Sequence, residues 1–314
     1  MADSLLVRLP NWLGDALMAR PMLHALRTAS PSREVVAIGP KPLTALLEAE
    51  GLWDRALDPG TPSWPRCDVA VLAPPSFSSA WRAFRSGTPR RIGFRGDARD
   101  LLLTDALPRV RRGDLHLSRE YLALADRAGA PEVPLPGLPV GEASGEASDA
   151  PFAVLAPGAI YGPAKRWPVS RFAETGRGLA ERGLALRVCG SAADVELCRR
   201  VAEAIPSALM LAGTTSLAQQ ASICARAALV VSNDSGLAHL AAAVGTPTLV
   251  VFGSTSSAWT APLGPRVRVV QRAPVCAPCF QRTCSIGTLC LERVEVKHVL
   301  DSADELLAAA RAAA

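Results

Sequence analysis

A group of residues able to hold an anion follows one apolar segment in the second half of the chain. Asp234, Ser235 and Gly236 follow the run Leu229–Val231 after two polar residues, and His239 stands four residues beyond Ser235. The run is typical of a buried parallel strand, and the apolar residues that follow recur at helical spacing. The first turn of such a helix presents free N–H groups and the positive end of its dipole, which favour a phosphate. An ordinary capped helix with a surface histidine is the alternative.

A second group of candidates lies in the loop PGAIYGPAKRWP, residues 157–168, which follows the apolar segment Phe152–Ala156. Gly158 allows a ligand to approach the backbone, and Lys165 and Arg166 supply cations. Beside the helix start at Asp234, this loop would hold a diphosphate without a metal ion. A basic surface loop is the alternative, although the grouping of glycine, lysine and tryptophan argues against it.

Asp15 is the candidate general base. It follows Gly14 in the turn between a first apolar segment and a helix. A carboxylate at this position could accept a proton from a substrate hydroxyl. The alternative is an acidic residue that only stabilises the helix N-terminus.

Arginine is unevenly distributed in the chain. The net charge of +5 does not by itself indicate nucleic-acid binding. Nine arginines nevertheless crowd the stretch from 82 to 112: Arg82, Arg85, Arg90, Arg91, Arg95, Arg99, Arg109, Arg111 and Arg112. Such a cluster suits an acidic or phosphorylated partner, and a solvated basic face is the commoner alternative.

The eight cysteines fall into two sets. Cys67, Cys189, Cys198 and Cys224 stand apart in apolar segments and are predicted to be small core residues. The second set lies within fifteen residues: Cys276, Cys279, Cys284 and Cys290. Their spacing is similar to that of a structural zinc site, while reduced packed thiols and an iron–sulfur cluster are the alternatives.

The elements that position these residues alternate between strands and helices, which is the pattern of an α/β doubly wound fold. Expected strands cover 4–9, 34–38, 67–72, 91–94, 152–156, 184–189, 208–211, 229–231, 248–252 and 267–271. Expected helices cover 16–28, 43–49, 77–85, 117–128, 170–182, 194–204, 216–226 and 299–312. Residues 131–150 are rich in Pro, Gly, Ser and Glu and are predicted to link a domain of residues 1–130 to one of residues 151–314.

Several classes of protein are excluded by what the sequence lacks. The first turn has no GxGxxG pattern, and no GxxxxGK[ST] occurs, which argues against nicotinamide enzymes and P-loop nucleotidases. No apolar run reaches the roughly 18 residues that span a bilayer. The N-terminal residues do not resemble a signal peptide, so a cytoplasmic location is expected.

Four segments carry a resemblance to a known family. They are PNWLGDALMARPML, PPSFSSAWRAFRSGTPRRIGFRGDARDLLL, PGAIYGPAKRWP and SNDSGLAHLAAAVGTPTLVVFG. Together they are similar to glycosyltransferase family 9, the heptosyltransferases, and the third is closest to the type II branch of that family. The resemblance implies a GT-B fold, in which two Rossmann-like domains face a cleft. The N-terminal domain would bind the acceptor and the C-terminal domain the nucleotide sugar, and the last helix could pack back on the N-terminal domain.

The resemblance also implies an activity. A family member of this type inverts the anomeric centre while moving L-glycero-D-manno-heptose from ADP-heptose to the heptosyl-Kdo2-lipid A inner core of lipopolysaccharide. Such an enzyme needs no cofactor for catalysis. It has no nucleic-acid partner and works at the cytoplasmic face of the inner membrane, in peripheral contact with the lipid.

Site residues follow from the same resemblance, position by position. Asp15 matches the general base, and Lys165 matches the lysine that binds the diphosphate. The positions that match donor contacts are Gly158, Asp194, Thr215, Asp234, Ser235, Gly236 and His239. We further expect Arg91 and Arg95 to meet phosphate or Kdo carboxylate groups of the acceptor.

Three other functions remain open on the sequence alone. A family member could use a different nucleotide sugar or acceptor, since these motifs recognise a diphosphate better than a sugar. A non-catalytic nucleotide-sugar-binding module would have no need of both Asp15 and Lys165. A sugar epimerase of the same architecture would leave the basic first domain without a role.

Overall fold

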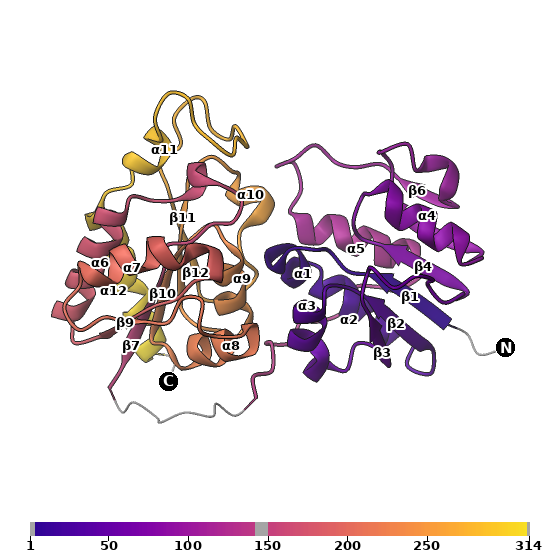
Figure 1. The fold of residues 1–314 in the computed structure, drawn as a ribbon, viewed down its shortest axis with the longest axis horizontal. Coiled ribbons are helices and arrows are strands. Elements are labelled where there is room, and N and C mark those ends of the chain that lie inside the picture. The colour runs from indigo at the N-terminus through magenta and orange to yellow at the C-terminus, as the bar shows by residue number, and fades with distance from the viewer. Residues whose placement is uncertain (1–3, 142–149, 313–314) are drawn as a thin grey trace. The chain divides into compact units, whose positions relative to one another are not determined.

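The computed structural model describes residues 4–141 and 150–312, and the chain divides into two compact units, Met1–Leu138 and Pro139–Ala314. Each unit is built on one six-stranded sheet whose neighbouring strands all run parallel (Figure 1). Helices cover both faces of each sheet, which explains why the strands are almost continuously apolar. The α/β prediction is confirmed.

The first unit has the strand order β3-β2-β1-β4-β5-β6. Its strands are β1 Ser4–Arg8, β2 Glu34–Ile38, β3 Arg55–Leu57, β4 Val69–Leu72, β5 Arg90–Phe94 and β6 Asp105–Leu107. Its helices are α1 Leu13–Met18, α2 Arg20–Ala29, α3 Lys41–Leu47, α4 Phe77–Arg85 and α5 Leu117–Arg127, with short 3-10 turns η1 Glu48–Glu50 and η2 Asp100–Leu102.

The second unit repeats this topology in the order β12-β11-β10-β7-β8-β9. Its strands are β7 Phe152–Ala156, β8 Ala185–Val188, β9 Leu209–Met210, β10 Leu229–Asn233, β11 Thr248–Phe252 and β12 Val267–Gln271. Its helices are α6 Val169–Glu181, α7 Val195–Glu203, α8 Leu217–Arg226, α9 Gly236–Ala243, α10 Ser257–Thr260, α11 Leu289–Glu292 and α12 Val296–Ala312, with 3-10 turns η3 Pro163–Lys165 and η4 Ala192–Asp194.

The strand order reverses at one point in each sheet. In the first unit it reverses between β1 and β4, and in the second between β7 and β10. At such a point the loops leaving the two central strands turn to opposite faces of the sheet and open a crevice at the carboxyl ends. Both the loop at 157–168 and the turn at Asp234 leave from this point in the second sheet.

Two features of the first unit differ from the sequence-based expectation. Residues 16–28 form not one helix but α1 and α2, which meet at Ala19. Pro21 explains the break, because it has no N–H to donate to the preceding turn. Strands β3 and β6 were not predicted, since each has three residues and neither carries a buried apolar run.

The predicted boundaries between the domains also shift in the structure. Residues 131–138 belong to the first unit: Arg20 Nη2 donates to the carbonyl oxygen of Pro136 at 2.9 Å, and Leu138 is buried. The part of the predicted linker at 142–149 lies outside the described residues. Helix α12 packs against α6, β11 and β12, and Val299 and Ala303 belong to the core of the second unit. The last helix is therefore part of the second unit. The resemblance alone would also have allowed this helix to pack back on the N-terminal domain.

The interior of both units is aliphatic. Cys67, Cys189, Cys198 and Cys224 are all buried, as predicted for small core residues. Burial raises the pKa of Cys189 and of Cys198 to about 12, so both remain thiols at neutral pH. In the described part of the chain, no helix combines the length and the apolar character needed to cross a membrane.

Candidate functional site

The two loops predicted to form the site are joined through Asn233, the last residue of β10. Its Nδ2 donates to the carbonyl oxygen of Pro157 at 2.7 Å, and its Oδ1 accepts from the Trp167 amide at 3.0 Å. Asn233 therefore holds both ends of the 157–168 loop against the turn that begins at Asp234. Because Asn233 and its partners are buried, these hydrogen bonds are costly to lose.

Lys165 and Asp234 meet at the centre of the site. Lys165 Nζ lies 2.6 Å from Asp234 Oδ2, and their side chains are 12% and 4% exposed. Thr255, in the loop after β11, donates its hydroxyl to the same oxygen at 2.5 Å. The structure thus brings together the predicted diphosphate lysine and the predicted donor-site aspartate. An arriving anion would find the ammonium group already ordered.

The start of α9 differs from the ordinary capped turn that the sequence left open as the alternative. Ser235 is the N-cap residue but makes no side-chain capping bond, and its Oγ lies 3.0 Å from Ser232 Oγ instead. Asp234 is turned toward Lys165. The Ser235 side chain therefore does not cap the first turn, which favours an external acceptor. His239 is 5% exposed, so it is a buried residue of this helix and not a surface histidine.

The carboxylate of Asp194 covers the backbone of Gly158. A Cβ atom at Gly158 would overlap the Asp194 carboxyl group, so only glycine allows this approach. Ser191 Oγ donates to Asp194 Oδ2 at 2.6 Å, and Arg166 Nη2 lies 3.6 Å from Oδ1. Both predicted donor-site residues are therefore adjacent, at the carboxyl ends of β7 and β8.

Thr215 lies in the loop after β9, next to the N-terminus of α8. Its hydroxyl accepts a hydrogen bond from Gln220 Nε2 at 3.2 Å, and the same amide donates to the carbonyl oxygen of Gly190 at 3.2 Å. Gln220 thus connects the loop after β9 to the loop after β8. This arrangement is compatible with the predicted contact to adenosine, which stays a prediction.

Tyr161 and Arg282 join the site although the sequence did not single them out. Lys165 Nζ lies 4.8 Å from the centroid of the Tyr161 ring, and Arg282 Cζ lies 5.4 Å from it. The backbone amide of Ala164 donates to the carbonyl oxygen of Arg282 at 3.1 Å. Two cations therefore share one aromatic ring in the vicinity of a single carboxylate, Asp234. No local pattern could reveal this, because Arg282 comes from a distant loop.

The cysteine-rich segment packs beside the site. The amides of Cys279 and Phe280 donate to the carbonyl oxygen of Ser254 at 3.0 and 2.8 Å. Tyr161 in turn donates its hydroxyl to the carbonyl oxygen of Phe280 at 2.5 Å. The segment thus ties the 157–168 loop to the loop after β11. Its cysteines therefore lie near the candidate site, but none of them is among the predicted donor contacts.

The four clustered cysteines are free thiols of different exposure. Cys276 and Cys279 are exposed, Cys284 is half-buried and Cys290 is buried, which raises the pKa of the Cys290 thiol. Within residues 4–141 and 150–312, no three His, Cys, Asp or Glu side chains are gathered closely enough to hold a metal ion. The arrangement seen here does not fit a four-thiolate zinc site, and zinc binding stays a prediction from the spacing alone.

Asp15 lies in the first unit, in the first turn of α1 and at the switch point of that sheet. It is half-buried, beside the exposed Trp12. Burial, together with the nearby charge of Asp15, raises the pKa of the Tyr121 phenol well above its ordinary value. The position fits a carboxylate that faces a ligand, and its role as base stays a prediction.

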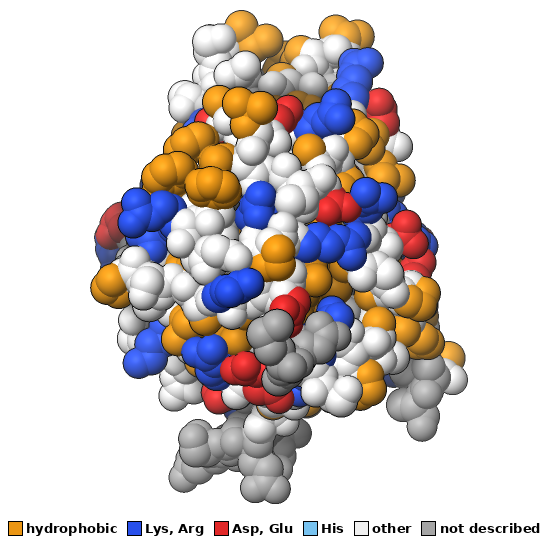
Figure 2. Space-filling model, turned by 90° about the vertical axis from the view of Figure 1, so that its right-hand side faces the viewer, with side chains coloured by type: hydrophobic (Ala, Val, Ile, Leu, Met, Phe, Trp, Pro, Cys, Tyr) orange, Lys and Arg blue, Asp and Glu red, His pale blue; other side chains and the backbone are white. Residues whose placement is uncertain are grey.

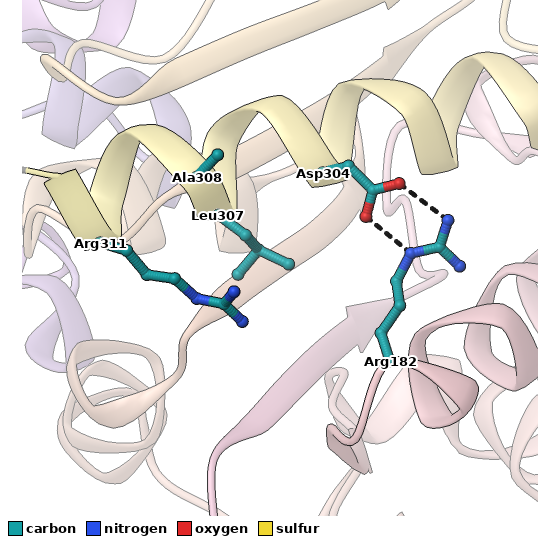
Figure 3. A pocket seen from close by; sticks show the side chains of 5 residues that line it. All are labelled: Arg182, Asp304, Leu307, Ala308 and Arg311. Carbon is teal, nitrogen blue, oxygen red and sulfur yellow. Dashed lines mark hydrogen bonds and ion pairs between the residues drawn. The ribbon is translucent and has the colours of Figure 1, made fainter.

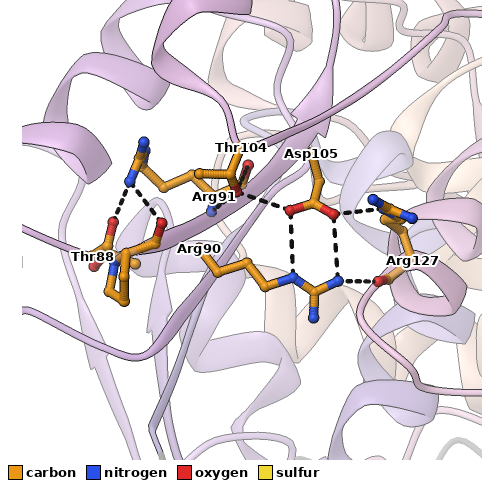
Figure 4. Close-up of polar contacts among 7 residues, drawn as sticks. Thr88, Arg90, Arg91, Thr104, Asp105 and Arg127 are labelled. Carbon is orange, nitrogen blue, oxygen red and sulfur yellow. Dashed lines mark hydrogen bonds and ion pairs between the residues drawn. The ribbon is translucent and has the colours of Figure 1, made fainter.

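The predicted acceptor arginines differ in how far the protein itself uses them. Arg91 Nε donates to the carbonyl oxygen of Leu102 at 2.6 Å. Its Nη1 donates to the carbonyl oxygen of Thr88 at 2.5 Å (Figure 4). Desolvation lowers the pKa of Arg91. Arg95 makes one such bond, from Nε to the carbonyl oxygen of Ala106 at 3.1 Å. Arg95 therefore keeps more donors for an acceptor than Arg91, and contact with acceptor remains a prediction for both.

A cavity of about 310 Å³ lies elsewhere in the second unit, along α12. Its wall includes the ion pair between Arg182 and Asp304, together with Leu307 and Arg311 (Figure 3). None of the predicted site residues lines it. Its guanidinium and carboxylate already satisfy one another, so this cavity adds nothing to the donor site.

Comparison with known proteins identifies what this arrangement resembles. Residues 65–289 match the family model described as glycosyltransferase family 9 (heptosyltransferase). The chain is 31% identical to lipopolysaccharide heptosyltransferase 2 of Escherichia coli K12, an alignment that covers 83% of this chain and 86% of that one. It is 32% identical to the protein of the same name from Salmonella typhimurium LT2, with the same coverage. The solved structure of E. coli ADP-heptose LPS heptosyltransferase II superposes with a TM-score of 0.81 at 26% identity, over 98% of this chain and 99% of that one.

Proposed function

The chain belongs to glycosyltransferase family 9, the heptosyltransferases, and we propose that it transfers a heptosyl group from ADP-heptose to the inner core of lipopolysaccharide. The donor is ADP-L-glycero-D-manno-heptose and the acceptor heptosyl-Kdo2-lipid A. The observation that carries the proposal is the ordered Lys165–Asp234 pair beside the start of α9, at the switch point of the second sheet. A diphosphate is the ligand that such a site favours.

The transfer is a direct displacement with inversion. Asp15 removes the proton of the acceptor hydroxyl while the hydroxyl oxygen attacks the anomeric carbon. The bond from that carbon to the diphosphate breaks, and negative charge grows on the departing ADP. Lys165 and the backbone amides at Ser235 and Gly236 stabilise this charge, so the step needs no metal ion.

Lys165 exchanges partners when the donor binds. Without donor its ammonium group is paired with Asp234, which keeps it in place and balances its charge. A bound diphosphate offers a second acceptor of higher charge, and Arg282 supplies a further cation across the Tyr161 ring. The site thereby avoids both an unpaired buried lysine before binding and an unpaired diphosphate after it.

The acceptor determines where the protein works. Its lipid A part is embedded in a membrane, so the enzyme acts in peripheral contact with the cytoplasmic face of the inner membrane. Arginines of the first unit, Arg95 foremost, bind phosphate or Kdo carboxylate groups of the acceptor.

The test is release of ADP from ADP-heptose, measured with and without heptosyl-Kdo2-lipid A, for the wild type and for Asp15→Ala. The proposal expects release that requires the acceptor and falls at least about 10³-fold in the variant. Release without acceptor would overturn the transferase and favour an epimerase or hydrolase. Acceptor-dependent release that survives the substitution would overturn the role of Asp15 only. No release from ADP-heptose, with release from another nucleotide sugar, would overturn the identity of the donor.

A further inference from the structure

An aromatic ridge, formed by Phe77, Trp81 and Phe84, runs along the solvent side of α4. The three side chains are 43%, 42% and 47% exposed. Their rings are stacked: the centroids of Phe77 and Trp81 are 6.3 Å apart with planes at 12°, and those of Trp81 and Phe84 are 6.0 Å apart at 28°. Such a contiguous apolar face on a surface helix indicates a contact with something outside the chain.

Arginine side chains border the aromatic ridge. Arg85 Cζ lies 5.9 Å from the centroid of Trp81, and Arg91 Cζ lies 5.5 Å from that of Phe84. Residues 77–96 contain five arginines and neither Asp nor Glu. Figure 2, which shows the side of the molecule where α4 lies, has hydrophobic side chains gathered beside Lys and Arg side chains. The ridge is thus apolar at its centre and bordered by guanidinium groups along Trp81 and Phe84. At its N-terminal end, Asp97 Oδ2 accepts from the Phe77 amide at 2.6 Å.

A cavity of about 480 Å³ opens next to the ridge, between α4 and the segment before β4. Trp64 and Trp81 form its aromatic walls, and Arg82 and Arg85 supply guanidinium groups. Arg82 is held in place, because its Nη1 donates to the carbonyl oxygen of Thr61 at 2.7 Å and its Cζ lies 6.0 Å from the centroid of Trp64. Among the described residues that line the cavity, none is acidic. Its size and charge suit a phosphate group with an organic substituent.

We propose that the aromatic ridge and the adjoining cavity dock this protein on an anionic phospholipid surface. The rings of Phe77, Trp81 and Phe84 enter the boundary between headgroups and acyl chains, where aromatic side chains are favoured. A lipid phosphate occupies the cavity against Arg82 and Arg85. The inference rests on the proposed function, in which the acceptor is linked to a lipid. It adds which surface of the protein makes the membrane contact.

Charge decides between a lipid surface and a second copy of the chain. Two copies meeting through this face would bring the arginines of one ridge against those of the other, which like-charge repulsion opposes. An anionic bilayer instead offers negative charge over its whole area, and each arginine near it strengthens binding about fivefold. The combination of exposed aromatic rings with Arg85 and Arg91 beside them therefore fits lipid better than self-association.

The experiment measures co-sedimentation of the full chain with vesicles of phosphatidylcholine alone and of phosphatidylcholine with 30% phosphatidylglycerol, in the absence of lipopolysaccharide. The proposal expects binding to the anionic vesicles, weakened by 0.5 M salt. Replacement of the ridge by Phe77→Ser, Trp81→Ser and Phe84→Ser should lower the partition coefficient at least about tenfold. Its matched control replaces three exposed apolar residues of the second unit, Leu209→Ser, Val275→Ser and Ile286→Ser, and should bind as the wild type does.

A milder variant keeps the test valid if the triple substitution unfolds the helix. Arg85→Gln should lower the partition coefficient about fivefold, and Arg272→Gln in the second unit should leave it unchanged. Glycerol phosphate at millimolar concentration should not displace the protein, because the bilayer itself contributes to binding. Displacement by glycerol phosphate would overturn lipid docking in favour of a site for a small soluble phosphate.

Three further outcomes would overturn the proposal. One is that the wild type fails to bind anionic vesicles, and another is that it binds them no better than the ridge triple variant and Arg85→Gln do. The third outcome is a concentration-dependent dimer in light scattering that the ridge substitutions abolish. Failure here is separable from failure of the proposed function, because transfer to a deacylated, water-soluble acceptor should stay within about twofold of wild type in the ridge variants.

Discussion

At the scale of single residues, the proposed transfer depends on how Lys165 is held. Asp234 and Thr255 fix its ammonium group within hydrogen-bond distance of one carboxylate oxygen. A lysine held in this way is ordered before the donor arrives, so little of its side-chain entropy is lost on binding. The pair therefore favours the charge that develops on the leaving group over the charge already present in the donor.

Substitution of Lys165 by methionine tests this role. We expect kcat to fall about 10²- to 10³-fold, because one preorganised cation would be missing from the transition state. The Kd for ADP, measured by calorimetry, should rise about tenfold. The control is Lys297→Met, on the exposed surface of α12, which should change neither value. Equal losses in the two variants would show that the effect comes from net charge and not from position.

Arg282 gives a second prediction at this scale. Its guanidinium lies over the ring that also carries Lys165, so Arg282→Ala should raise the KM for ADP-heptose about five- to tenfold with a smaller effect on kcat. Arg272→Ala provides an exposed arginine of the same unit for comparison. Unchanged donor affinity in Arg282→Ala would place this arginine outside the donor site.

At the scale of elements, Asn233 determines the shape of the site by joining β10 to both ends of the 157–168 loop. Asn233→Ala would leave the Pro157 carbonyl and the Trp167 amide buried without these partners. We expect a loss of about 2–4 kcal/mol in the free energy of unfolding of the second unit, measured in urea. Asn233→Asp retains an acceptor for Trp167 but sets a buried carboxylate oxygen against the Pro157 carbonyl oxygen, so it should not recover the lost stability. An Asn233→Ala protein with the same free energy of unfolding in urea as the wild type would contradict this account.

The elements that the sequence predicted well carry apolar residues at a clear strand or helix spacing. Strands β7, β11 and β12 and helix α4 begin and end at the expected residues. Strands β3 and β6 were missed because pairing with a neighbour, and not their own composition, makes them strands. The contacts among Lys165, Thr255 and Arg282 were likewise beyond local patterns, since they join three loops. The spacing of residues 234–239 could be read from the sequence, but the turn of Asp234 toward Lys165 could not.

At the scale of the whole molecule, acid should affect the two units unequally. Glu50 is buried and bonded to Arg20 and His24. Burial alone would raise its pKa, but the hydrogen bonds to His24 and Arg20 more than offset this and lower it. Asp54 of the same unit also has a lowered pKa, because its carboxylate is hydrogen-bonded to Arg27. For Asp105, burial would raise the pKa, but the hydrogen bond to Arg90 helps to lower it.

A carboxyl group whose pKa is lower in the folded state stabilises the fold above its unfolded pKa, and this contribution is lost as pH falls through the folded value. We therefore expect the first unit to lose stability between about pH 5 and pH 2, followed by tryptophan fluorescence and by hydrogen exchange. Glu50→Gln should lower its free energy of unfolding by about 3 kcal/mol at pH 7 and flatten this dependence. An acid transition of the first unit that is identical in Glu50→Gln would contradict the assignment.

Separate cores give the last prediction. The second unit has its own buried clusters, and every residue placed at the donor site lies in it. ADP should therefore stabilise this unit by mass action, by about 2.7 kcal/mol at a concentration 100 times its Kd. In hydrogen exchange, protection should appear in β7, β10, α9 and the 157–168 loop, while residues 4–138 exchange at the rate seen without ADP. The Lys165→Met protein should show less protection at the same ADP concentration. If ADP protected the first unit as strongly as the second, the nucleotide would stabilise both units together. The donor site could then not be assigned to the second unit alone.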